Sequence, residues 1–235
     1  MKSWKGYNII DLILVTVGVT TVLISGIIFN SKWYMIVSTL LGLFYVFTQA
    51  KGKIATQFLG VIYFCFYIYI AYSQSYYGEA LVYLIVMLPM YFYGIIHWLA
   101  NRYKKDNVVI IRDNLSKKEW LFLGVVSLVL SVGIYFLLKA LNTKHIIVNL
   151  LSFITIIPAV YLLMRRCRWN HVAFLINDFI VPLLWVFLVI EGDWSFLPLC
   201  IYHIFQITYD IYGLVEWARL EKNQKIEFEK EKDLS

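Results

Sequence analysis

Charged residues are scarce in this 235-residue chain. Asp, Glu, Lys and Arg make up only 15% of it, against about 25% in an ordinary soluble domain. Hydrophobic residues make up 61%, and the mean hydropathy is +0.71. This composition excludes a disordered chain, and a core of this size cannot enclose so much apolar surface. The sequence therefore predicts a protein that buries the rest of that surface in lipid.

Cysteines and catalytic signatures are equally sparse. The three cysteines, Cys65, Cys167 and Cys200, have neither metal-ligand spacing nor the pattern of a disulfide framework. The sequence has no H-E-x-x-H or G-x-S-x-G motif and no phosphate-binding loop. We therefore expect no metal, no cofactor and no enzymatic activity. The net charge of +6 raises the possibility of nucleic-acid binding, but the placement of the charges favours a membrane topology instead.

The apolar residues fall into eight runs, each about long enough to cross the hydrocarbon core of a bilayer. The runs are 9–29, 33–50, 54–72, 79–99, 120–141, 146–164, 171–190 and 195–217. Backbone polar groups must be paired in lipid, so we expect eight transmembrane helices. No cleavage site follows the first run, which we interpret as a retained helix.

The basic residues indicate the orientation of these spans. With eight spans, 18 of the 21 Lys and Arg residues fall on one side, in the N-terminus, in 51–53, 100–119 and 165–170, and in the C-terminal tail. The positive-inside rule then places both termini in the cytosol. Glu79, Glu191 and Asp193 lie on the opposite side. Six tryptophans at the span ends are expected to form interfacial belts: Trp33, Trp98, Trp120, Trp169, Trp194 and Trp217.

Two spans share the pattern Y-x9-Y-G-x3-W. It occurs as Tyr83, Tyr93-Gly94 and Trp98, and again 119 residues later as Tyr202, Tyr212-Gly213 and Trp217. Gln57 and Asn177, one span earlier in each case, are 120 residues apart. Because the matched spans are four apart, the repeats run in the same direction, which is typical of duplicated transporter halves. Chance recurrence of common membrane residues is the alternative.

The repeat predicts a 3+1+3 arrangement of two parallel three-helix bundles plus an extra N-terminal helix. The segments are 1–32 for the extra helix, 33–99 for the first bundle, 100–145 for a basic cytosolic loop and linker helix, 146–217 for the second bundle and 218–235 for a charged cytosolic tail. A cavity between the bundles is the expected place for function.

Polar residues within spans are the candidates for substrate contact, because they are costly in lipid and usually face a bundle interior. At about 100° per residue, one face of the last span gathers Tyr202, His203, Gln206, Tyr209 and Asp210. Rings and amides together suit a small polar ring compound such as a sugar-bearing heterocycle. The alternative is that these groups only hydrogen-bond between helices.

The order of the spans and several short motifs resemble the PnuC-type nicotinamide riboside transporters. The motifs are Gln57–Gly60 (N/Q-x-x-G), Tyr77-Gly78-Glu79, and the two Y-G-x3-W endings, and the resemblance covers about residues 33–217. It implies a SWEET-like fold in a bacterial inner membrane and facilitated diffusion of a vitamin-like nucleoside. It also implies a functional link to a cytosolic kinase that traps the substrate by phosphorylation. Association into homo-oligomers is left open.

The resemblance carries Gln57, Asn177, Asp178 and Tyr202 onto the family's site. The full set of expected substrate-binding residues is Gln57, Tyr63, Asn177, Asp178, Trp185, Tyr202, His203, Gln206, Tyr209 and Asp210. In this hypothesis Asn177, Gln206 and Gln57 bind ribose or amide groups. Trp185, Tyr202 and Tyr209 form stacking walls. Asp178 or Asp210 favours a pyridinium cation.

The seventh span departs from the family pattern W-x2-W-x3-[ND]. This chain has His171, Phe174 and Asp178 at that spacing, and Val82 and Met90 occupy positions in the fourth span where polar residues are common. Related carriers transport thiamine or deoxynucleosides, so these remain alternative substrates. A membrane-embedded enzyme that uses His203 and Asp210 as acid and base is a second hypothesis. A structural or sensory membrane protein is a third.

Overall fold

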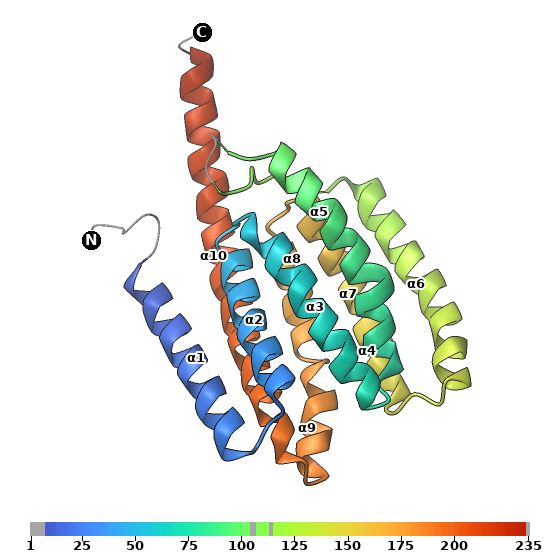
Figure 1. Cartoon of the computed structure of the whole chain (residues 1–235). Coiled ribbons are helices and arrows are strands. Elements are labelled where there is room, and N and C mark those ends of the chain that lie inside the picture. Colours follow the sequence, from blue (N-terminus) through green and yellow to red (C-terminus); the bar gives the residue numbers. More distant parts are fainter. Residues whose placement is uncertain (1–7, 104–106, 113–114, 234–235) are drawn as a thin grey trace.

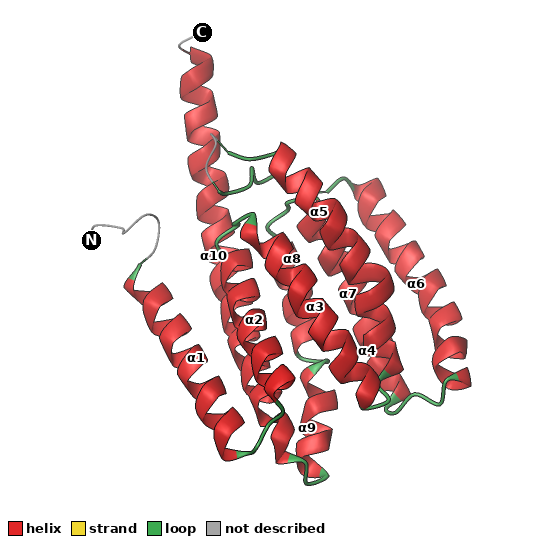
Figure 2. Ribbon diagram, in the orientation of Figure 1, coloured by secondary structure: helices red, strands yellow, loops and turns green. Residues whose placement is uncertain are grey.

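Helices make up almost all of the regular structure. The computed structural model describes residues 8–103, 107–112 and 115–233. Its helices are α1 (Ile9–Ile28), α2 (Trp33–Ala50), α3 (Ala55–Ser73), α4 (Tyr77–Val82), α5 (Leu88–Ala100), α6 (Lys117–Ala140), α7 (Ile146–Met164), α8 (Asn170–Asp178), α9 (Pro182–Ile190) and α10 (Leu197–Asp233). Figure 2 shows helices and loops but no strand in the described part of the chain, which confirms the all-α prediction.

Two helices begin at capping boxes that are readable in the sequence. At the start of α1, the Asn8 backbone N–H donates to the Asp11 carboxylate at 2.7 Å, and the Asp11 N–H donates to the Asn8 side chain at 2.9 Å. Ser116 and Glu119 make the same reciprocal pair at the start of α6. Each pair satisfies N–H groups that the first turn of a helix leaves without partners.

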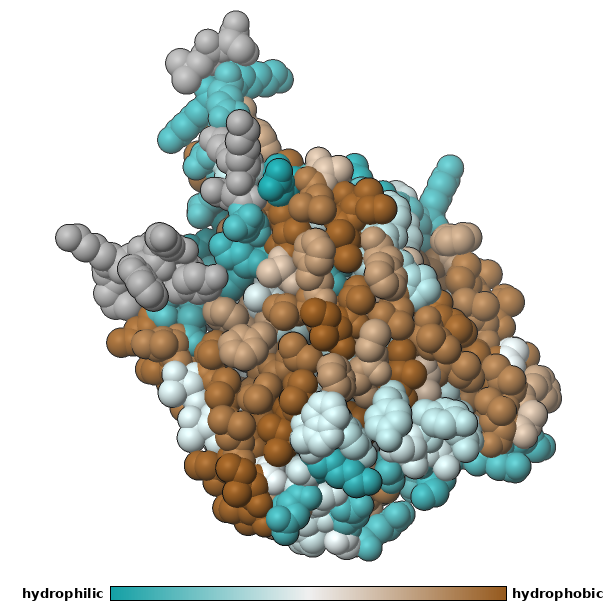
Figure 3. Space-filling view, in the orientation of Figure 1, coloured by the Kyte–Doolittle hydropathy of each residue, from teal (hydrophilic) through white to brown (hydrophobic). Residues whose placement is uncertain are grey.

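Seven helical segments of the described chain are long and apolar enough to cross a membrane, which makes this a multi-pass membrane protein. They are Ile9–Ile28, Trp33–Ala50, Ala55–Ser73, Tyr77–Ala100, Lys117–Ala140, Ile146–Met164 and Asn170–Ile190. Each lies within three residues of a predicted run at both ends. The eighth predicted run, 195–217, falls in α10, where His203, Gln206 and Asp210 lower the hydropathy. Figure 3 shows a broad apolar band on the visible face, with hydrophilic residues toward both ends.

Six helical segments pack as a closed ring. Starting from α2, each contacts the next in the order α2, α3, the α4–α5 segment, α7, α8 and α10, and α10 contacts α2 again. Outside this ring, α6 packs on α7, and α1 packs on α2 and α10 (Figure 1). The interior of the ring is therefore the place where polar side chains can avoid lipid.

The turns that follow α2 and α7 have the same backbone geometry. Gly52 and Arg166, 114 residues apart, both have a φ of +60°. The Lys53 N–H donates to the Thr48 carbonyl at 2.9 Å, and 114 residues later the Cys167 N–H donates to the Leu162 carbonyl at 3.0 Å. The local structure of the chain thus repeats in register over these turns.

The segment 107–112 connects the two turns. Its Val109 N–H donates to the Gly52 carbonyl and its Arg112 N–H donates to the Arg166 carbonyl, both at 3.0 Å. Gln224 holds the same segment against α10, because its amide donates to the Val109 carbonyl at 3.0 Å and accepts from the Ile111 N–H at 2.9 Å. The basic loops therefore lie at one end of the molecule, where α10 extends beyond the other helices (Figure 1).

The two glycines of the repeated motif serve the same packing role. A Cβ on Gly94 would lie 2.2 Å from the Gln57 amide oxygen, and one on Gly213 would lie 2.4 Å from the His171 ring. Each glycine therefore admits a polar side chain from the preceding span. His171, rather than Asn177, is the structural counterpart of Gln57, so the predicted match between Gln57 and Asn177 is wrong.

Of the six tryptophans expected at the interface, three are exposed, Trp169 is half-buried and two are fully buried. Trp33, Trp120 and Trp194 are exposed at helix ends, as interfacial anchors should be. Trp98 and Trp217 are 0% exposed, and their ring centroids lie 6.1 Å apart. The Trp217 indole N–H donates to the Gln49 carbonyl at 2.9 Å. These two residues therefore join the matched helices α5 and α10 in the core.

A buried ion pair fastens α1 to the ring. The Lys51 ammonium lies 2.8 Å from the Asp11 carboxylate and 3.3 Å from Glu216 of α10, and it donates to the Tyr212 hydroxyl at 2.6 Å. Asp11 and Lys51 are both buried. The sequence had placed Lys51 in a solvated loop, but the surrounding carboxylates allow it to lie inside the protein.

Candidate functional site

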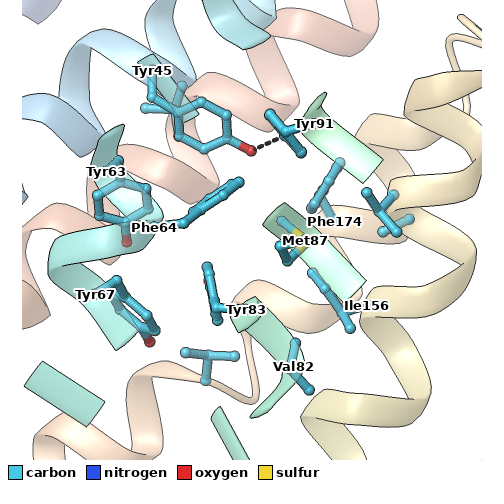
Figure 4. Packing of buried hydrophobic residues seen from close by; sticks show 14 of the residues in the cluster. Tyr45, Tyr63, Phe64, Tyr67, Val82, Tyr83, Met87, Tyr91, Ile156 and Phe174 are labelled. Atoms are coloured by element: carbon cyan, nitrogen blue, oxygen red, sulfur yellow. Dashed lines mark hydrogen bonds between the residues drawn. The ribbon is translucent and has the colours of Figure 1, made fainter. Parts of the chain in front are cut away.

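Tyrosine rings from three helices form one wall of the ring interior. Tyr45 of α2, Tyr63 and Tyr67 of α3, and Tyr83 and Tyr91 of the α4–α5 segment are all buried. Figure 4 shows them gathered around Phe64. The Tyr67 and Tyr83 centroids are 4.3 Å apart, and the Tyr45 and Tyr91 hydroxyls are 2.5 Å apart. The wall is aromatic but carries hydroxyl groups.

The opposite wall is acidic and comes from α8 and α10. The Gln206 amide donates to the Asp178 carboxylate at 2.6 Å, and Asp210 lies 2.6 Å from the His171 ring nitrogen Nδ1. The two bonds lie next to each other on the facing helices, since His171 and Asp178 are seven residues apart on α8 and Gln206 and Asp210 are four residues apart on α10. These side chains form one buried group.

The two walls meet at Tyr202 of α10. The Tyr202 and Tyr63 ring centroids are 5.6 Å apart. The next residue, His203, lies beside Gln206. The Tyr63 hydroxyl also lies near enough to Asp178 for a charge on that carboxyl group to act on it. Rings, amide and carboxylates therefore belong to one connected cluster.

Several polar atoms of this cluster have unused hydrogen-bonding capacity. Among the described residues, no hydrogen-bond partner of good geometry is present for the Tyr63 hydroxyl, the Asp178 Oδ2 atom or either ring nitrogen of His203. All three side chains are almost fully buried. These atoms are therefore able to bond to a polar molecule that enters the cluster.

Trp185 extends the aromatic wall toward the end opposite the basic loops. Its indole N–H donates to the Tyr67 hydroxyl at 3.0 Å, and its ring stacks on Phe196 at 5.9 Å. Trp185 is fully buried, although its indole is polar at one edge. Its predicted role in stacking on a substrate stays a prediction.

One helical segment of each wall is interrupted. Tyr83–Met87 is π-helical and is followed by Pro89, which has no N–H to continue the α-helical pattern. The other break lies between Asp178 and Pro182, where the Asn177 carbonyl accepts bonds from Ile180 and Val181. Interrupted helices within a membrane are typical of transporter sites, where irregular backbone lines a cavity.

The structure brings together seven of the ten predicted site residues. Tyr63, Asp178, Tyr202, His203, Gln206 and Asp210 lie in the cluster, and Trp185 joins it through Tyr67. Gln57 lies beside Gly94 instead, near the start of α3. Asn177 donates its amide to Ser152 and Thr155 of α7. Tyr209 packs on Phe47 of α2.

Some residues of the interior were missed as candidates. Glu79 was expected in an exposed acidic turn, but it is 0% exposed, and its carboxylate accepts a bond from the Tyr67 hydroxyl at 3.4 Å. His171 and Tyr45 were also missed. Glu79 lies only three residues into α4, so its place near a span end gave no sign of burial. For His171, the sequence did offer a signal: this histidine stands where the family pattern has a tryptophan.

The charges of the interior are of one sign. The helical segments Ala55–Ser73, Tyr77–Ala100 and Asn170–Ile190 and the first 21 residues of α10 contain no Lys or Arg, but they contribute Glu79, Asp178 and Asp210. The described residues also contain no group of three or more His, Cys, Asp or Glu that could hold a metal ion. Such an interior suits a neutral or positively charged organic molecule and disfavours an anion.

Comparison with known proteins gives a consistent result. A family model described as nicotinamide mononucleotide transporter matches residues 32–226. Two curated relatives are each named nicotinamide riboside transporter PnuC. The one from Haemophilus influenzae is 26% identical over 232 residues, covering 94% of each chain. The one from Neisseria mucosa is 24% identical over 200 residues, covering 83% of this chain and 76% of the relative.

The fold also matches a solved structure. The crystal structure of the vitamin B3 transporter PnuC superposes with a TM-score of 0.82, covering 93% of this chain and 94% of the other, at 21% sequence identity. Helix α1 ends before residue 32, so it lies outside the region that the family model matches. The structural match, by contrast, covers almost the whole chain.

Proposed function

This chain belongs to the nicotinamide mononucleotide transporter family, and from that premise we propose that it carries nicotinamide riboside, or a closely related nucleoside, by facilitated diffusion. The observation that carries the proposal is the buried cluster around Asp178, Tyr63 and His203. In the described part of the chain, the Asp178 Oδ2 atom, the Tyr63 hydroxyl and the His203 ring nitrogens have no hydrogen-bond partner of good geometry. Ribose hydroxyls and a carboxamide have the donors and acceptors that such a cluster needs.

The charge of the interior supports the riboside over the mononucleotide. A mononucleotide carries a phosphate, and the helices around the cluster offer that group no Lys or Arg. The riboside carries a pyridinium cation, which Asp178 and Asp210 would attract in a partly dry site. Tyr202 and Trp185 would stack on the planar ring. Thiamine also contains a cationic ring, and it belongs among the competitors to be tested.

The proposed architecture has eight spans. The first half of α10 would be the eighth, since its polar face lies inside the ring and its other face is apolar. The two three-helix bundles would be α2 with α3 and α4–α5, and α7 with α8–α9 and α10. Helix α6 would be the linker and α1 the extra helix. The duplicated turns after α2 and α7 support this division.

We further propose that the protein lies in a bacterial inner membrane with both termini in the cytosol. The basic end of the molecule, where 51–53, 107–112 and 165–167 meet, would face inward. Rocking of the two bundles about the cluster would expose it to either side, with the interruptions before Pro89 and Pro182 as hinges. Phosphorylation by a separate cytosolic kinase would then retain the substrate.

The experiment that tests the function is uptake of labelled nicotinamide riboside into liposomes that contain the purified protein. We expect saturable uptake that does not respond to an imposed proton or sodium gradient. Competition is expected from unlabelled riboside and not from the mononucleotide. Absence of saturable uptake would overturn the assignment, and strict dependence on a gradient would overturn the passive mechanism.

A matched pair of variants links uptake to the cluster. Gln206→Ala removes the donor to Asp178, whereas Thr208→Ala changes a half-buried residue of the same helix whose hydroxyl donates to the Ile204 carbonyl. We expect a rise of at least about tenfold in the KM of Gln206→Ala, because a hydrogen bond to a charged group is worth about 1.5–3 kcal/mol. The Thr208→Ala variant should transport normally.

A further inference from the structure

The structure places a third carboxyl group in the ring interior, apart from the Asp178–Asp210 pair. Glu79 is fully buried near the start of α4, at the end of the molecule opposite the basic loops. Its backbone N–H donates to the Asn149 side chain of α7 at 3.0 Å, which fixes this part of α4 against the second half of the chain. Glu79 is therefore held at a defined place inside the ring.

The Glu79 carboxylate is only partly satisfied. One oxygen accepts a long bond of 3.4 Å from the Tyr67 hydroxyl. The other, Oε1, has no hydrogen-bond partner of good geometry among the described residues, although Ser152 lies close to the side chain. No Lys or Arg forms an ion pair with Glu79 in the described part of the chain, and none occurs in α3, α4, α7 or α9. A buried carboxylate with so few partners can still bind a cation or accept a hydrogen bond from another donor.

Aromatic rings lie next to this carboxylate and lead from it to the acidic wall. Tyr67 bonds to Glu79 through its hydroxyl, and its ring lies against Tyr83 and Trp185. The Tyr63 ring lies 5.5 Å from the Tyr67 ring and 5.6 Å from the ring of Tyr202 on α10, measured between centroids. Ring faces attract cations, so two carboxylates joined by tyrosines form a path that favours positive charge.

We propose that Glu79 and the rings of Tyr67, Tyr83 and Trp185 form a second subsite, which selects organic cations as they move between the outer end of the ring and Asp178. The inference rests on the proposed function for the identity of the cargo. It goes further in assigning cation selectivity to Glu79, outside the central acidic pair. A planar, positively charged heterocycle is the chemical class that this subsite fits.

The test compares two substrates that differ in charge but hardly in shape: nicotinamide riboside, which is cationic, and its reduced dihydropyridine form, which is neutral. Uptake of each is measured in liposomes for the unmodified protein and for Glu79→Gln. We expect Glu79→Gln to lower kcat/KM for the cation about tenfold, in keeping with loss of one charge-assisted contact, and to leave the neutral form nearly unchanged. An unchanged ratio between the two substrates, or an equal loss for both, would overturn the proposal.

The matched control is Glu191→Gln. Glu191 is an exposed acidic residue at the same end of the molecule, so this variant removes the same charge without touching the subsite. It should keep the original preference for the cation. A purely structural, neutral Glu79 would be mimicked by Gln, and the preference for the cation would then be unaffected. If Glu79→Gln does not fold, Glu79→Asp is used instead. Its carboxylate keeps the charge, but the side chain is one methylene shorter. We expect a several-fold loss of kcat/KM for the cation and no loss for the neutral form.

A binding measurement separates failure of this inference from failure of the proposed function. If the unmodified protein transports neither riboside, the proposed function is wrong. The small pyridinium ion 1-methylnicotinamide can then be tested directly for its effect on the melting temperature of the purified protein. A shift in the unmodified protein and in Glu191→Gln, absent in Glu79→Gln, supports the subsite. Equal shifts in all three proteins, or no shift in any, would overturn it.

Discussion

Asn177 and Gln206 are similar side chains on adjacent helices, yet they point to different surroundings. The Gln206 amide donates to Asp178 inside the cluster, whereas the Asn177 amide donates to the Ser152 carbonyl at 3.1 Å and the Thr155 hydroxyl at 2.9 Å. Asn177 therefore joins α8 to α7. In a membrane, bonds of this kind stabilise the packing of one helix on another.

This difference gives a prediction at the residue scale. We expect Asn177→Ala to lower the free energy of unfolding by about 1–2 kcal/mol, because the amide supports an interhelical contact in lipid. The KM for the riboside should stay near that of the unmodified protein. Thermal unfolding in detergent and uptake in liposomes measure the two quantities. A normal melting temperature combined with a raised KM would place Asn177 in the binding site instead.

Helical periodicity predicted the α10 face well, because all five residues of that face are at least nine-tenths buried. It could not tell which partner each side chain would meet. Tyr209 lies on the same face as Tyr202, yet it reaches Phe47 of α2 rather than the cluster. Asn177 and Asp178 are adjacent, so their side chains point about 100° apart and only one of them can face α10. Such choices depend on the neighbouring helix, which the sequence of one helix does not contain.

At the scale of elements, close contact between spans depends on the repeated glycines. A Cβ on Gly213 would come within 2.4 Å of the His171 ring, which is itself bonded to Asp210. Gly124 of α6 has nothing within 4 Å of the same position. The two residues thus allow the same substitution to be compared in a packed and in an open environment.

We expect Gly213→Ala to destabilise the protein by about 1–3 kcal/mol, because the added methyl group must displace His171 or separate α10 from α8. Gly124→Ala should have little effect or stabilise slightly, since alanine favours a helix over glycine. Melting temperatures of the two variants provide the measurement. Equal melting temperatures would mean that the α8–α10 contact is looser than the structure indicates.

The extents of the spans were predictable because lipid demands long apolar helices, and seven of them lie within three residues of their predicted bounds. The positions at which these helices are interrupted could not be predicted. Pro89 and Pro182 marked where helices could bend, but Pro158 lies inside α7 without ending it. Whether a proline interrupts a helix depends on what pairs with the freed carbonyl groups. The π-helical segment at Tyr83–Met87 likewise leaves no local signature in the sequence.

At the scale of the whole molecule, the buried charges of Lys51 and Asp11, together with the partly buried Glu216, join α1 to both halves of the ring. Lys51 follows α2, Glu216 belongs to α10, and Asp11 belongs to α1. Burial alone would lower the pKa of the Lys51 ammonium, but its bonds to Asp11 and Tyr212 and the charge of Glu216 raise it above the usual 10.5. The ion pair is therefore intact throughout the neutral range.

The raised pKa fixes the sign of a pH dependence. A group whose pKa is higher in the folded state contributes stability that is present below its unfolded pKa and is lost as the pH rises through the folded value. We therefore expect the contribution of Lys51 to be constant from pH 6 to about pH 9 and to fall only under strongly alkaline conditions. Lys51→Met should cost about 3–5 kcal/mol at neutral pH, because it leaves the buried Asp11 carboxylate without its cationic partner.

Unfolding of Lys51→Met and of Lys222→Met at pH 7 and pH 9 measures this effect. Lys222 is exposed on α10 and serves as the control, since removing its charge should change little. A loss in Lys51→Met that varied strongly between these two pH values would contradict the expected titration. A loss no larger than that of Lys222→Met would mean that α1 is not held by the ion pair.

The orientation of the molecule in the bilayer is the remaining property of the whole chain, and it follows from the placement of charge. The basic turns at Lys53 and Arg166 lie at one end with the extension of α10, whereas Glu191 lies at the other end. The positive-inside rule predicts that Lys222→Cys is protected from a membrane-impermeant thiol reagent in intact cells and that Glu191→Cys is labelled. The three native cysteines are replaced by alanine first. Opening the cells should expose Lys222→Cys, and the reverse pattern of labelling would require the subsite at Glu79 to face the cytosol.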